Sequence, residues 1–400
     1  MADDDSILVL NVGSSSFKFA VFSAAARPTR AALKCSGECT GVGHHAHICA
    51  RDGDGESLAD EDLAADADHK TVLAWLLAFL ERRDATLNIS AAVHRIVHGG
   101  TRFTAPARVT PEVIDELTRL IPMAPLHQPA ALTAIASLAQ RHPQMPQVVC
   151  FDTAFHRTQS ATATAFALPR HLTQDGIRRF GFHGISYEYI AGVLPEVIGA
   201  TASGRVVVAH LGSGASLCAL RGGRSIATTM SFTPLDGLPM SRRCGSLDPG
   251  VVLYLMQHKG MTAEQISKLL NEESGMMGVS TISDDMQVLL CSKDPRAAEA
   301  VDLFVYRIGL ELGAMAAALH GLDALVFTGG IGEHAASIRR RVCEDAAWLG
   351  VALDAGSNEA GATCITHPGG SASAWIIPTD EDLMMVRHAW DTLHTDIGSR

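Results

Sequence analysis

The chain has 400 residues, of which 47% are hydrophobic and 19% charged, and its formal net charge is −11. This length exceeds that of one ordinary hydrophobic core, so two domains are expected. The negative charge excludes a dedicated nucleic-acid or anionic-membrane surface, and no uncharged run is long enough to span a membrane. Nine irregularly spaced cysteines and an acidic N-terminus that runs straight into a strand predict a cytoplasmic protein with reduced thiols and no signal peptide.

The first predicted element is a β-hairpin over residues 7–22, ILVLNVGSSSFKFAVF, in which a Gly/Ser turn separates two apolar strands. The backbone N–H groups at such a turn can bind a phosphate. The same pattern returns in residues 206–220, VVVAHLGSGASLCAL, where His210 to Ser213 correspond to Asn11 to Ser14. The chain therefore resembles two copies of one phosphate-binding unit.

A cluster of thiols and imidazoles follows the first hairpin: Cys35, Cys39, His44, His45, His47 and Cys49. A zinc site is one interpretation, but the segment contains no C-x-x-C pair. Because the sequence HAHIC alternates as a half-buried strand would, we prefer a structural strand with polar residues on its solvent face.

The rest of the first half predicts helices over residues 69–83, 111–121 and 129–141, with a short buried strand after the first helix and another after the third. Arg95 lies in the first of these strands, where an arginine is unusual unless something anionic holds it. Asp152 ends the second strand, at the edge where α/β sheets place ligand groups. An N-cap for the following segment explains Asp152 equally well.

The second half contains two loops with unusual sequences. In residues 178–186, His183 lies between two glycines, which would allow a ligand to approach the backbone closely, although a surface histidine would look the same. Residues 231–250 contain too many prolines and glycines for a regular element, and long ordered loops are usually functional. This second loop carries Arg242 and Arg243.

A long helix over residues 297–320 leads into the strand and glycine turn ALVFTGGIGEH, with a new helix opening at about Ala335. A strand, a glycine turn and a helix N-terminus together form an anion and nucleotide site. The last helix is expected to have Thr379 as its N-cap and Glu381 in its first turn, where the helix dipole by itself favours a negative charge.

Three glycine-rich loops, isolated arginines and two candidate metal-binding carboxylates, Asp152 and Glu381, together suggest phosphoryl transfer, which depends on positioning and on stabilising negative charge. The P-loop motif is absent, and the H-R-I sequence at His94 continues as a strand, unlike the catalytic loop of protein kinases.

Along nearly its whole length the sequence resembles the acetokinase family, within the superfamily of acetate and sugar kinases, heat-shock cognate and actin. Nine stretches carry the resemblance, in this order: NVGSSSFK, HRIVHGG, APLHQP, FDTAFH, RRFGFHG, HLGSGAS, RRCGSLDPG, FTGGIGEH and IPTDED.

The resemblance implies an α/β protein with duplicated ribonuclease H-like (actin-like ATPase) domains, mixed sheets flanked by helices, and an active-site cleft between the domains. The N-terminal domain would span residues 1–152 and be completed by about 380–400, and the nucleotide-binding domain would span 153–379. The implied activity is reversible, Mg²⁺-dependent, in-line transfer of the ATP γ-phosphoryl group to acetate, by a cytoplasmic homodimer. A propionate or other short-chain acyl kinase is the near alternative, and a non-catalytic nucleotide sensor is the alternative from another class.

The resemblance also implies the site residues. The catalytic residues would be Arg95, Asp152, His183 and Arg243, and Arg95 would also bind the substrate carboxylate beside Val97, Leu126, His127, Phe182 and Pro234. Asn11 and Glu381 would hold Mg²⁺ or Mn²⁺. ATP or ADP would contact Ser14, Ser16, Lys18, His210, Leu211, Gly212, Ser213, Gly214, Asp285, Met286, Gln287, Gly330, Ile331, Gly332, Glu333 and His334. Because a short carboxylate is already ionised near neutral pH, Asp152 is better interpreted as orienting an arginine or the hydrated magnesium than as a base.

The sequence departs from the family pattern mainly on the nucleotide side. Where the family usually has Asn, Gly-Thr, Asp, Arg and Asn, this chain has Ser213, Ser241 with Arg242, Ser246, Gln287 and His334. Glutamine lacks the delocalised cation that stacks on an aromatic base, so weaker ATP binding is expected. Arg242 beside Arg243 would partly compensate at the phosphates.

Overall fold

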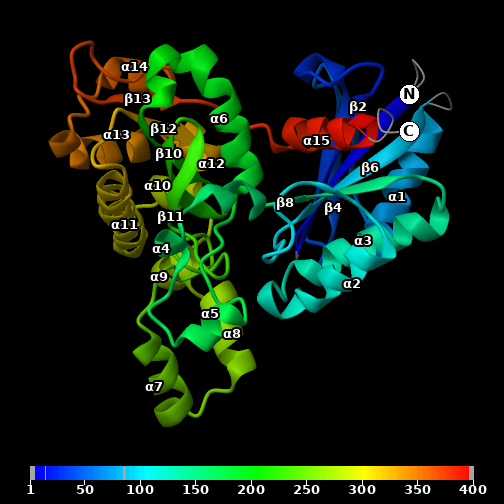
Figure 1. Ribbon diagram of the computed structural model, residues 1–400, viewed down its shortest axis with the longest axis horizontal. Coiled ribbons are helices and arrows are strands. Elements are labelled where there is room, and N and C mark those ends of the chain that lie inside the picture. The colour runs from blue at the N-terminus through cyan, green and yellow to red at the C-terminus, as the bar shows by residue number, and fades with distance from the viewer. Residues whose placement is uncertain (1–4, 14, 84–86, 396–400) are drawn as a thin grey trace. The chain divides into compact units, whose positions relative to one another are not determined.

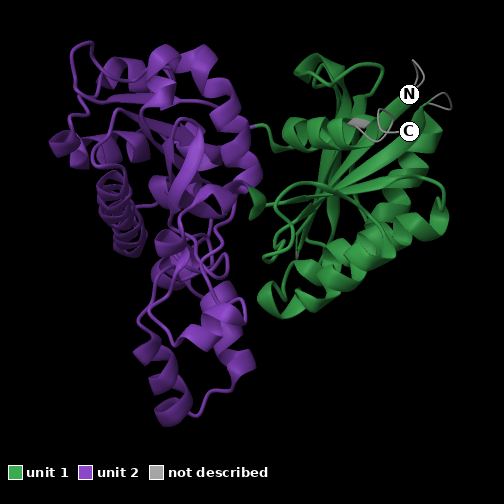
Figure 2. Cartoon of the chain, viewed as in Figure 1, with its two compact units in different colours: residues 1–154, 380–400 green, residues 155–379 purple. Residues whose placement is uncertain are grey.

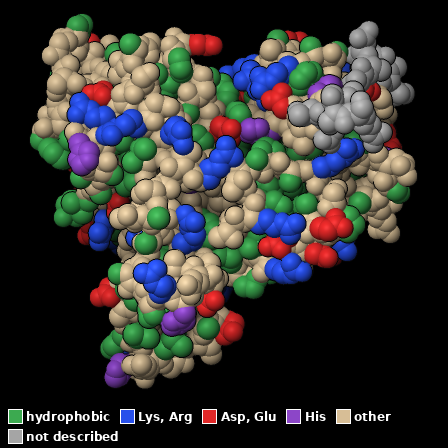
Figure 3. All heavy atoms as spheres, in the orientation of Figure 1, with side chains coloured by type: hydrophobic (Ala, Val, Ile, Leu, Met, Phe, Trp, Pro, Cys, Tyr) green, Lys and Arg blue, Asp and Glu red, His purple; other side chains and the backbone are tan. Residues whose placement is uncertain are grey.

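The computed structural model describes residues 5–13, 15–83 and 87–395. Ser14, predicted to contact the nucleotide, lies outside these residues. The chain divides into two compact units, one formed by Met1–Ala154 with Asp380–Arg400 and the other by Phe155–Thr379 (Figure 2). None of the helices in the described part has the length and apolarity that a membrane span requires. Lysine and arginine side chains are dispersed among acidic ones over the face in Figure 3.

The first unit is built on a mixed sheet with the strand order β5-β4-β3-β2-β1-β6-β8-β7. The first five strands along the chain pair antiparallel with their neighbours, whereas β6 lies parallel to β1 and β8 parallel to β6. The strands are β1 (Asp5–Val12), β2 (Ser16–Ser23), β3 (Leu33–Thr40), β4 (His47–Asp52), β5 (Ser57–Asp62), β6 (Asn88–Ile96), β7 (Ala107–Arg108) and β8 (Gln147–Phe151).

Helices cover both faces of this sheet because its central strands are apolar on both sides. Buried side chains of α1 (His69–Arg83) and α3 (Gln128–Arg141) pack on one face, and α2 (Pro111–Arg119) extends this layer. α15 (Glu381–Thr395) contacts β1, β6 and β8 from the other face (Figure 1). This second face is the one on which Asn11 and Arg95 lie.

The predicted N-cap of α15 was wrong. The Asp380 carboxylate accepts a hydrogen bond from the Leu383 backbone N–H at 3.0 Å, so Asp380 caps the helix one residue later than expected. The Thr379 hydroxyl instead contacts the Ser186 hydroxyl at 2.9 Å. Aspartate caps as well as threonine does, so the sequence allowed both choices.

The second unit is built on a sheet with the order β11-β10-β9-β12-β13. Its strands are β9 (Arg205–Leu211), β10 (Ala215–Arg221), β11 (Arg224–Thr228), β12 (Ala324–Thr328) and β13 (Ser373–Ile376). The first three are antiparallel, and β12 and β13 are parallel to β9. α6 (Gly184–Ile198) packs on one face, whereas α11 (Pro295–Leu319) contacts β9, β10 and β11.

The remaining elements of the second unit are short. They are α4 (Ala161–Thr164), α5 (Arg170–Gln174), α7 (Pro249–Lys259), α8 (Ala263–Glu272), α9 (Gly275–Ser280), α10 (Met286–Cys291), α12 (Gly329–His334), α13 (Ala336–Asp345) and α14 (Ala355–Glu359). Single 3₁₀ turns across the two units are η1 (Arg30–Ala32), η2 (Ile121–Met123), η3 (Ala154–Thr158), η4 (Gly199–Ser203) and η5 (Ala347–Leu349).

The two sheets repeat one topology. The order β3-β2-β1-β6-β8 in the first unit matches β11-β10-β9-β12-β13 in the second, with the same pattern of antiparallel and parallel pairs. Both predicted hairpins form, with Val12 paired to Phe17 and Leu211 paired to Ala215. The predicted fold class, duplicated α/β domains with mixed sheets flanked by helices, is confirmed. The first unit adds the hairpin β4–β5 and the short strand β7.

Candidate active site

The first unit contains an ion pair where two parallel strands end. Arg95 lies near the end of β6, and Asp152 directly follows β8. The Arg95 Nε and Nη2 atoms donate to the two Asp152 oxygens at 2.8 and 2.7 Å. The Asp152 side chain is 1% exposed and that of Arg95 20% exposed. Such a bidentate pair fixes the guanidinium plane and leaves its remaining N–H groups for other acceptors.

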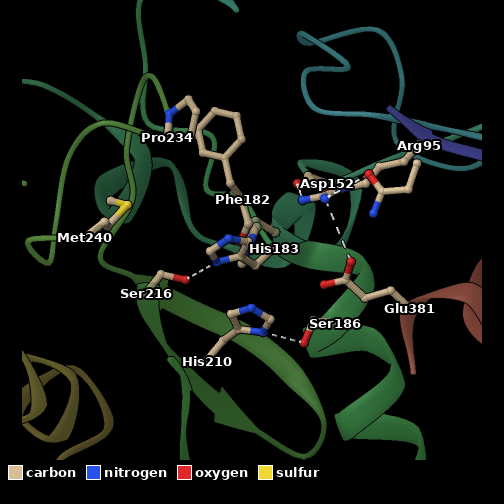
Figure 4. Close-up of polar contacts among 12 residues, drawn as sticks. Arg95, Asp152, Phe182, His183, Ser186, His210, Ser216, Pro234, Met240 and Glu381 are labelled. Atoms are coloured by element: carbon tan, nitrogen blue, oxygen red, sulfur yellow. Dashed lines mark hydrogen bonds and ion pairs between the residues drawn. The ribbon is translucent and has the colours of Figure 1, made fainter. Parts of the chain in front are cut away.

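Two further residues predicted at the site meet the same guanidinium. Arg95 Nη1 donates to the Asn11 Oδ1 at 3.3 Å, and it lies 3.9 Å from a carboxylate oxygen of Glu381 (Figure 4). Burial by itself lowers the pKa of Arg95, but the charges of Asp152 and Glu381 outweigh it, so this pKa is raised. Arg95 therefore stays charged throughout the physiological range.

Carboxylates accumulate beside Arg95 at the start of α15. Burial, reinforced by the charges of Glu381 and Asp380, raises the pKa of Asp382 to about 7. Among these acids, Glu381 shares the Arg95 Nη1 with the Asn11 oxygen, and carboxylate and amide oxygens are the hard ligands that magnesium prefers. A divalent cation there would relieve the repulsion among these acids.

The other residues of the first unit predicted at the site occupy varied positions. Lys18 is half exposed on β2, where its Nζ lies 3.4 Å from Glu38. Ser16 closes the first hairpin by accepting the Gly13 N–H on its backbone oxygen at 2.9 Å. Val97 directly follows β6, Leu126 lies in the turn before α3, and His127 is the N-cap of α3. The structure thus brings Asn11, Arg95, Asp152 and Glu381 together, whereas Lys18 is engaged by a separate acid.

In the second unit, His183 has an unusual backbone. It is the N-cap residue of α6 and has a φ of 56°, the left-handed conformation. Such a conformation is strained in a non-glycine residue and clusters at functional sites. Gly181, one of the two glycines around His183, also packs closely within the chain. A Cβ on Gly181 would lie 2.6 Å from both His156 and Thr228, so packing within the chain already requires this glycine.

A buried hydroxyl orients the His183 ring. Ser216 on β10 lies 2.9 Å from the His183 Nδ1 and 2.5 Å from the Tyr187 hydroxyl, and it is fully buried (Figure 4). The other ring nitrogen, Nε2, faces the tip of the second hairpin, where a Cβ on Gly214 would lie 3.0 Å from it. Glycine at position 214 therefore leaves room for the imidazole beside the turn.

His210 continues this group of rings. Its imidazole stacks on that of His183 with 4.3 Å between ring centroids, and its Nδ1 lies 2.8 Å from the Ser186 hydroxyl. Ser186 in turn contacts Thr379. The two imidazoles are thus held as one stacked pair by hydroxyl groups from α6, β10 and the segment before α15.

The glycine turn after β12 is itself helical, because residues 329–334 form α12 before α13 begins at Ala336. Predicted nucleotide contacts Gly330, Ile331, Gly332, Glu333 and His334 all lie in α12. The Glu333 carboxylate folds back to accept the Gly329 N–H at 2.8 Å and the Thr379 N–H at 3.3 Å. Its charge therefore holds the turn in shape.

The glycine turn lies against the tip of the second hairpin. A Cβ on Gly212 would lie 3.9 Å from the Gly330 nitrogen, and a Cβ on Gly329 would lie 2.8 Å from the Leu211 oxygen. The predicted nucleotide contacts at positions 211–214 and 330–334 are therefore neighbours. Ser213 contributes its backbone oxygen, which accepts the Ser241 N–H at 3.2 Å.

The long loop brings Arg243 close to the same hairpin. Its Nη1 donates to the Pro234 carbonyl at 3.0 Å, contacts the Met240 sulfur at 3.6 Å, and lies 4.0 Å from a Cβ placed on Gly214. Figure 4 labels Phe182, Pro234 and Met240 with the two histidines.

Arg242 does not supply a spare charge, because its Nε donates to Asp284 at 2.6 Å. Asp285 caps α10 through the Gln287 N–H at 2.7 Å, with Met286 buried and Gln287 exposed.

Four residues of this polar network were missed at the sequence level: Ser186, Tyr187, Ser216 and Thr379. Ser186 and Tyr187 lie three and four residues after His183, a spacing that puts them near it on the first turn of a helix. That signal was available. Ser216 is a small residue in an alternating strand and gave no signal, because its partners come from a distant segment.

The same order of five strands occurs in both units, and each copy has a glycine turn where strands end. One copy also has an arginine–carboxylate pair. These features define a phosphotransferase with the duplicated actin-like ATPase fold. The chain belongs to the acetokinase family, which matches residues 6–387. The predicted resemblance is thereby confirmed.

Individual relatives agree with this family. An acetate kinase of Rhodopseudomonas palustris is 58% identical over 389 residues, covering 96% of this chain and 98% of the relative. The structure of a propionate kinase from Francisella tularensis superposes with a TM-score of 0.89 at 33% identity, covering 96% and 98% of the two chains. Porphyromonas gingivalis acetate kinase gives 0.83 at 34% identity, covering 98% and 99%.

Proposed function

We propose that the protein is an acetate kinase, which transfers the γ-phosphoryl group of ATP to acetate, reversibly and in line, giving acetyl phosphate and ADP. The observation that carries the proposal is the Arg95–Asp152 pair in a member of the acetokinase family. An arginine held in one plane at the end of a buried strand suits a small carboxylate, and the 58% identical relative is an acetate kinase.

In this mechanism Arg95 binds and orients the substrate carboxylate. Asp152 fixes the guanidinium plane by accepting from its Nε and Nη2 atoms. The charges of Asp152 and Glu381 raise the pKa of Arg95. Acetate is ionised near neutral pH, so its oxygen attacks the γ-phosphorus without a strong general base. Asp152 therefore positions Arg95 and removes no proton.

The second unit stabilises the transferring group. His183, whose Nδ1 is held by Ser216, presents Nε2 beside Gly214, and Arg243 lies beside the same glycine. Both side chains are placed to stabilise negative charge on the equatorial phosphoryl oxygens. The backbone N–H groups of residues 212–214 and of the first turn of α12 would bind the phosphates of the nucleotide.

The metal fits the residues present. Asn11 and Glu381 offer hard oxygen atoms near one end of Arg95, the donor type that magnesium prefers. Bound there, Mg²⁺ or Mn²⁺ would neutralise charge on the phosphates. Asn11 and Glu381 would orient the metal. Arg95 lies between Asp152 and Glu381 and reduces the repulsion between these two carboxylates. Following the family resemblance, we further propose a cytoplasmic homodimer.

A propionate kinase is the second candidate, because the structure of the Francisella tularensis propionate kinase superposes with a TM-score of 0.89. The two substrates differ by one methylene, which is worth only about 1–3 kcal/mol in an apolar pocket. Steady-state hydroxamate assays with acetate, propionate and butyrate separate the candidates. A larger kcat/KM for acetate supports the proposal, and a larger value for propionate replaces it with the second candidate. No acyl phosphate from any of the three, with ATP still bound, would indicate a nucleotide sensor.

The ATP dependence of the same assay tests the departures from the family pattern. Gln287 is exposed at the start of α10, and the charge of Arg242 is balanced by Asp284. We therefore propose that ATP binds more weakly than to a relative with arginine at this position. Replacing Gln287 with arginine should lower the KM for ATP and leave the KM for acetate unchanged.

A further inference from the structure

The hairpin β4–β5 forms the edge of the first sheet and has no counterpart in the second unit. His47 and Cys49 are two residues apart on β4, so they point to the same side, and Asp60 and Asp62 do the same on β5. Asp60 pairs with Cys49 and Asp62 with His47 in the strand register. Ile48 and Ala50 fill the core beneath, which leaves the four polar side chains together on the solvent side.

Three of these side chains converge on one point. The His47 Nε2 lies 3.3 Å from the Cys49 Sγ and 3.0 Å from an Asp60 oxygen, and the sulfur lies 3.7 Å from that same oxygen. Around a tetrahedral zinc, ordinary bond lengths place nitrogen, oxygen and sulfur ligands about 3.3–3.6 Å apart. The triangle of ligand atoms therefore already has nearly the size of one face of a zinc tetrahedron.

The fourth side chain fixes the imidazole. The Asp62 carboxylate lies 2.8 Å from the His47 Nδ1, the nitrogen that points away from the cluster. Histidine ligands of metals are commonly oriented in this way by a carboxylate on the distal nitrogen, which also makes the coordinating nitrogen more basic. The arrangement thus supplies both the ligands and their support.

A cysteine, a histidine and an aspartate in series could also indicate a nucleophilic thiol. One contact argues against that reading. An Asp60 oxygen lies 3.0 Å from the His47 Nε2, the nitrogen that would have to act as the base toward the sulfur. A cation bound between the three groups accounts for all of these contacts.

We propose that His47, Cys49 and Asp60 form a binding site for a thiolate-preferring divalent metal, with Zn²⁺ as the natural ion, and that Asp62 positions the histidine. The Cys49 proton is released when the metal–sulfur bond forms, and water completes the coordination. A thiolate and an imidazole select against Mg²⁺, which the kinase reaction uses elsewhere. The metal would cross-link the two strands at an exposed sheet edge, where pairing is otherwise weakest.

Cobalt reports on such a site directly, because a thiolate ligand gives a charge-transfer absorption band that Co²⁺ bound to oxygen and nitrogen alone lacks. We expect the full-length chain, titrated with Co²⁺ in excess Mg²⁺, to develop this band at one equivalent and to lose it on adding Zn²⁺. Cys49→Ser and Cys49→Ala should abolish the band. His47→Ala and Asp60→Asn should weaken binding at least tenfold, and Asp62→Asn by roughly tenfold.

Two other exposed residues provide matched controls. Cys291 is an exposed free cysteine on α10, and His44 is an exposed histidine just before β4. Cys291→Ser and His44→Ala should leave the band and the Co²⁺ affinity unchanged. No Co²⁺–thiolate band in the wild type, or a band that disappears with Cys291→Ser and persists with Cys49→Ser, overturns the proposal.

Alkylation of the unmodified protein gives a second readout that needs no variant. With iodoacetamide and peptide mass mapping, one equivalent of Zn²⁺ should slow labelling of Cys49 at least tenfold and leave labelling of Cys291 unchanged. Equal protection of both cysteines, or of neither, contradicts the site. Turnover of acetate should be the same for wild type and Cys49→Ser, which separates this proposal from the proposed kinase activity.

Discussion

The two sheets share one frame, but the residues at the equivalent positions differ in charge. Strand register matches Asn11 to His210 and Lys18 to Ser216 in the hairpins. In the parallel strands it matches His94 to Phe327, Arg95 to Thr328 and Asp152 to Thr379. At three of these five pairs, Lys18 with Ser216, Arg95 with Thr328 and Asp152 with Thr379, the first unit has a cation or an acid where the second has a hydroxyl.

The difference follows from what each sheet would bind. A small acid and a hydrated metal offer no large surface, so full charges must hold them. A nucleotide brings several phosphates that backbone N–H groups can bind, so neutral hydroxyls that fix the glycine turns suffice. The comparison teaches that a duplicated frame can divide one reaction between its copies by changing residues only at the strand ends.

The largest expected effect comes from removing the charges that distinguish the first unit. Arg95→Ala should lower kcat/KM for acetate by at least 10³ and destabilise the protein by about 3–5 kcal/mol, because Asp152 would remain buried and unpaired. The matched change in the second sheet, Thr328→Ala, should leave the rate within roughly tenfold. Acyl phosphate assays and urea unfolding measure both. A stable Arg95→Ala protein would show that the Asp152 charge is compensated in another way.

Arg243→Ala tests the second unit with the same type of residue. We expect kcat to fall by about 10²–10³ with the fold intact, because Arg243 lies in the long loop and not in a strand or helix. Near-normal turnover would refute its proposed contact with the phosphoryl group.

Ser216 should show a smaller effect on rate. Ser216→Ala removes the hydroxyl that holds the His183 Nδ1 and the Tyr187 hydroxyl, so we expect roughly tenfold lower kcat, little change in KM, and a loss of about 1–3 kcal/mol of stability. Ser216→Thr should restore most of the rate if the hydroxyl is what matters.

The equivalent change in the first sheet, Lys18→Ala, should alter the free energy of unfolding by less than about 1 kcal/mol, because Lys18 forms an exposed ion pair.

A last expected effect concerns only the pH dependence of stability, and it compares His94 with a variant that has the phenylalanine of the equivalent position 327. Burial lowers the pKa of His94 to about 4, although the hydrogen bond to Gln147 partly opposes this. The unfolded chain takes up a proton below pH about 6.5 and the folded chain does so only near 4, so stability falls as the pH drops through this range. Between pH 7 and 5 the wild type should lose about 2 kcal/mol more than His94→Phe. Equal losses in urea unfolding would contradict the buried neutral state.

Much of the frame could be predicted from sequence because its signals are local. The two hairpins repeat one pattern of apolar strands around a Gly/Ser turn, and Arg95 in an apolar strand indicated a charged partner. The identity of that partner could not be derived from spacing alone, since Asp152 served equally well as an N-cap. The N-cap of α15 is Asp380, one residue after the predicted Thr379, and the sequence could not distinguish the two because both residue types cap helices well.

Contacts between segments that are distant in the chain could not be predicted from the sequence. Ser216 and Ser186 are ordinary residues until the sheet and α6 bring them to the two histidines. At His47 the sequence favoured a structural strand over a metal site, because the segment has no C-x-x-C pair and alternates, and it did not show that Asp60 and Asp62 lie beside it on β5. In both cases the missing information was which strands pair.

The order of synthesis gives α15 a particular consequence. Residues 155–379 are contiguous and leave the ribosome before Glu381 does, whereas the first unit is interrupted by all of them. The acid that meets Arg95 is therefore translated only after the whole second unit. A chain that stopped before Glu381 would carry a finished second unit and an arginine without this carboxylate, so the proposed reaction would have to wait for α15.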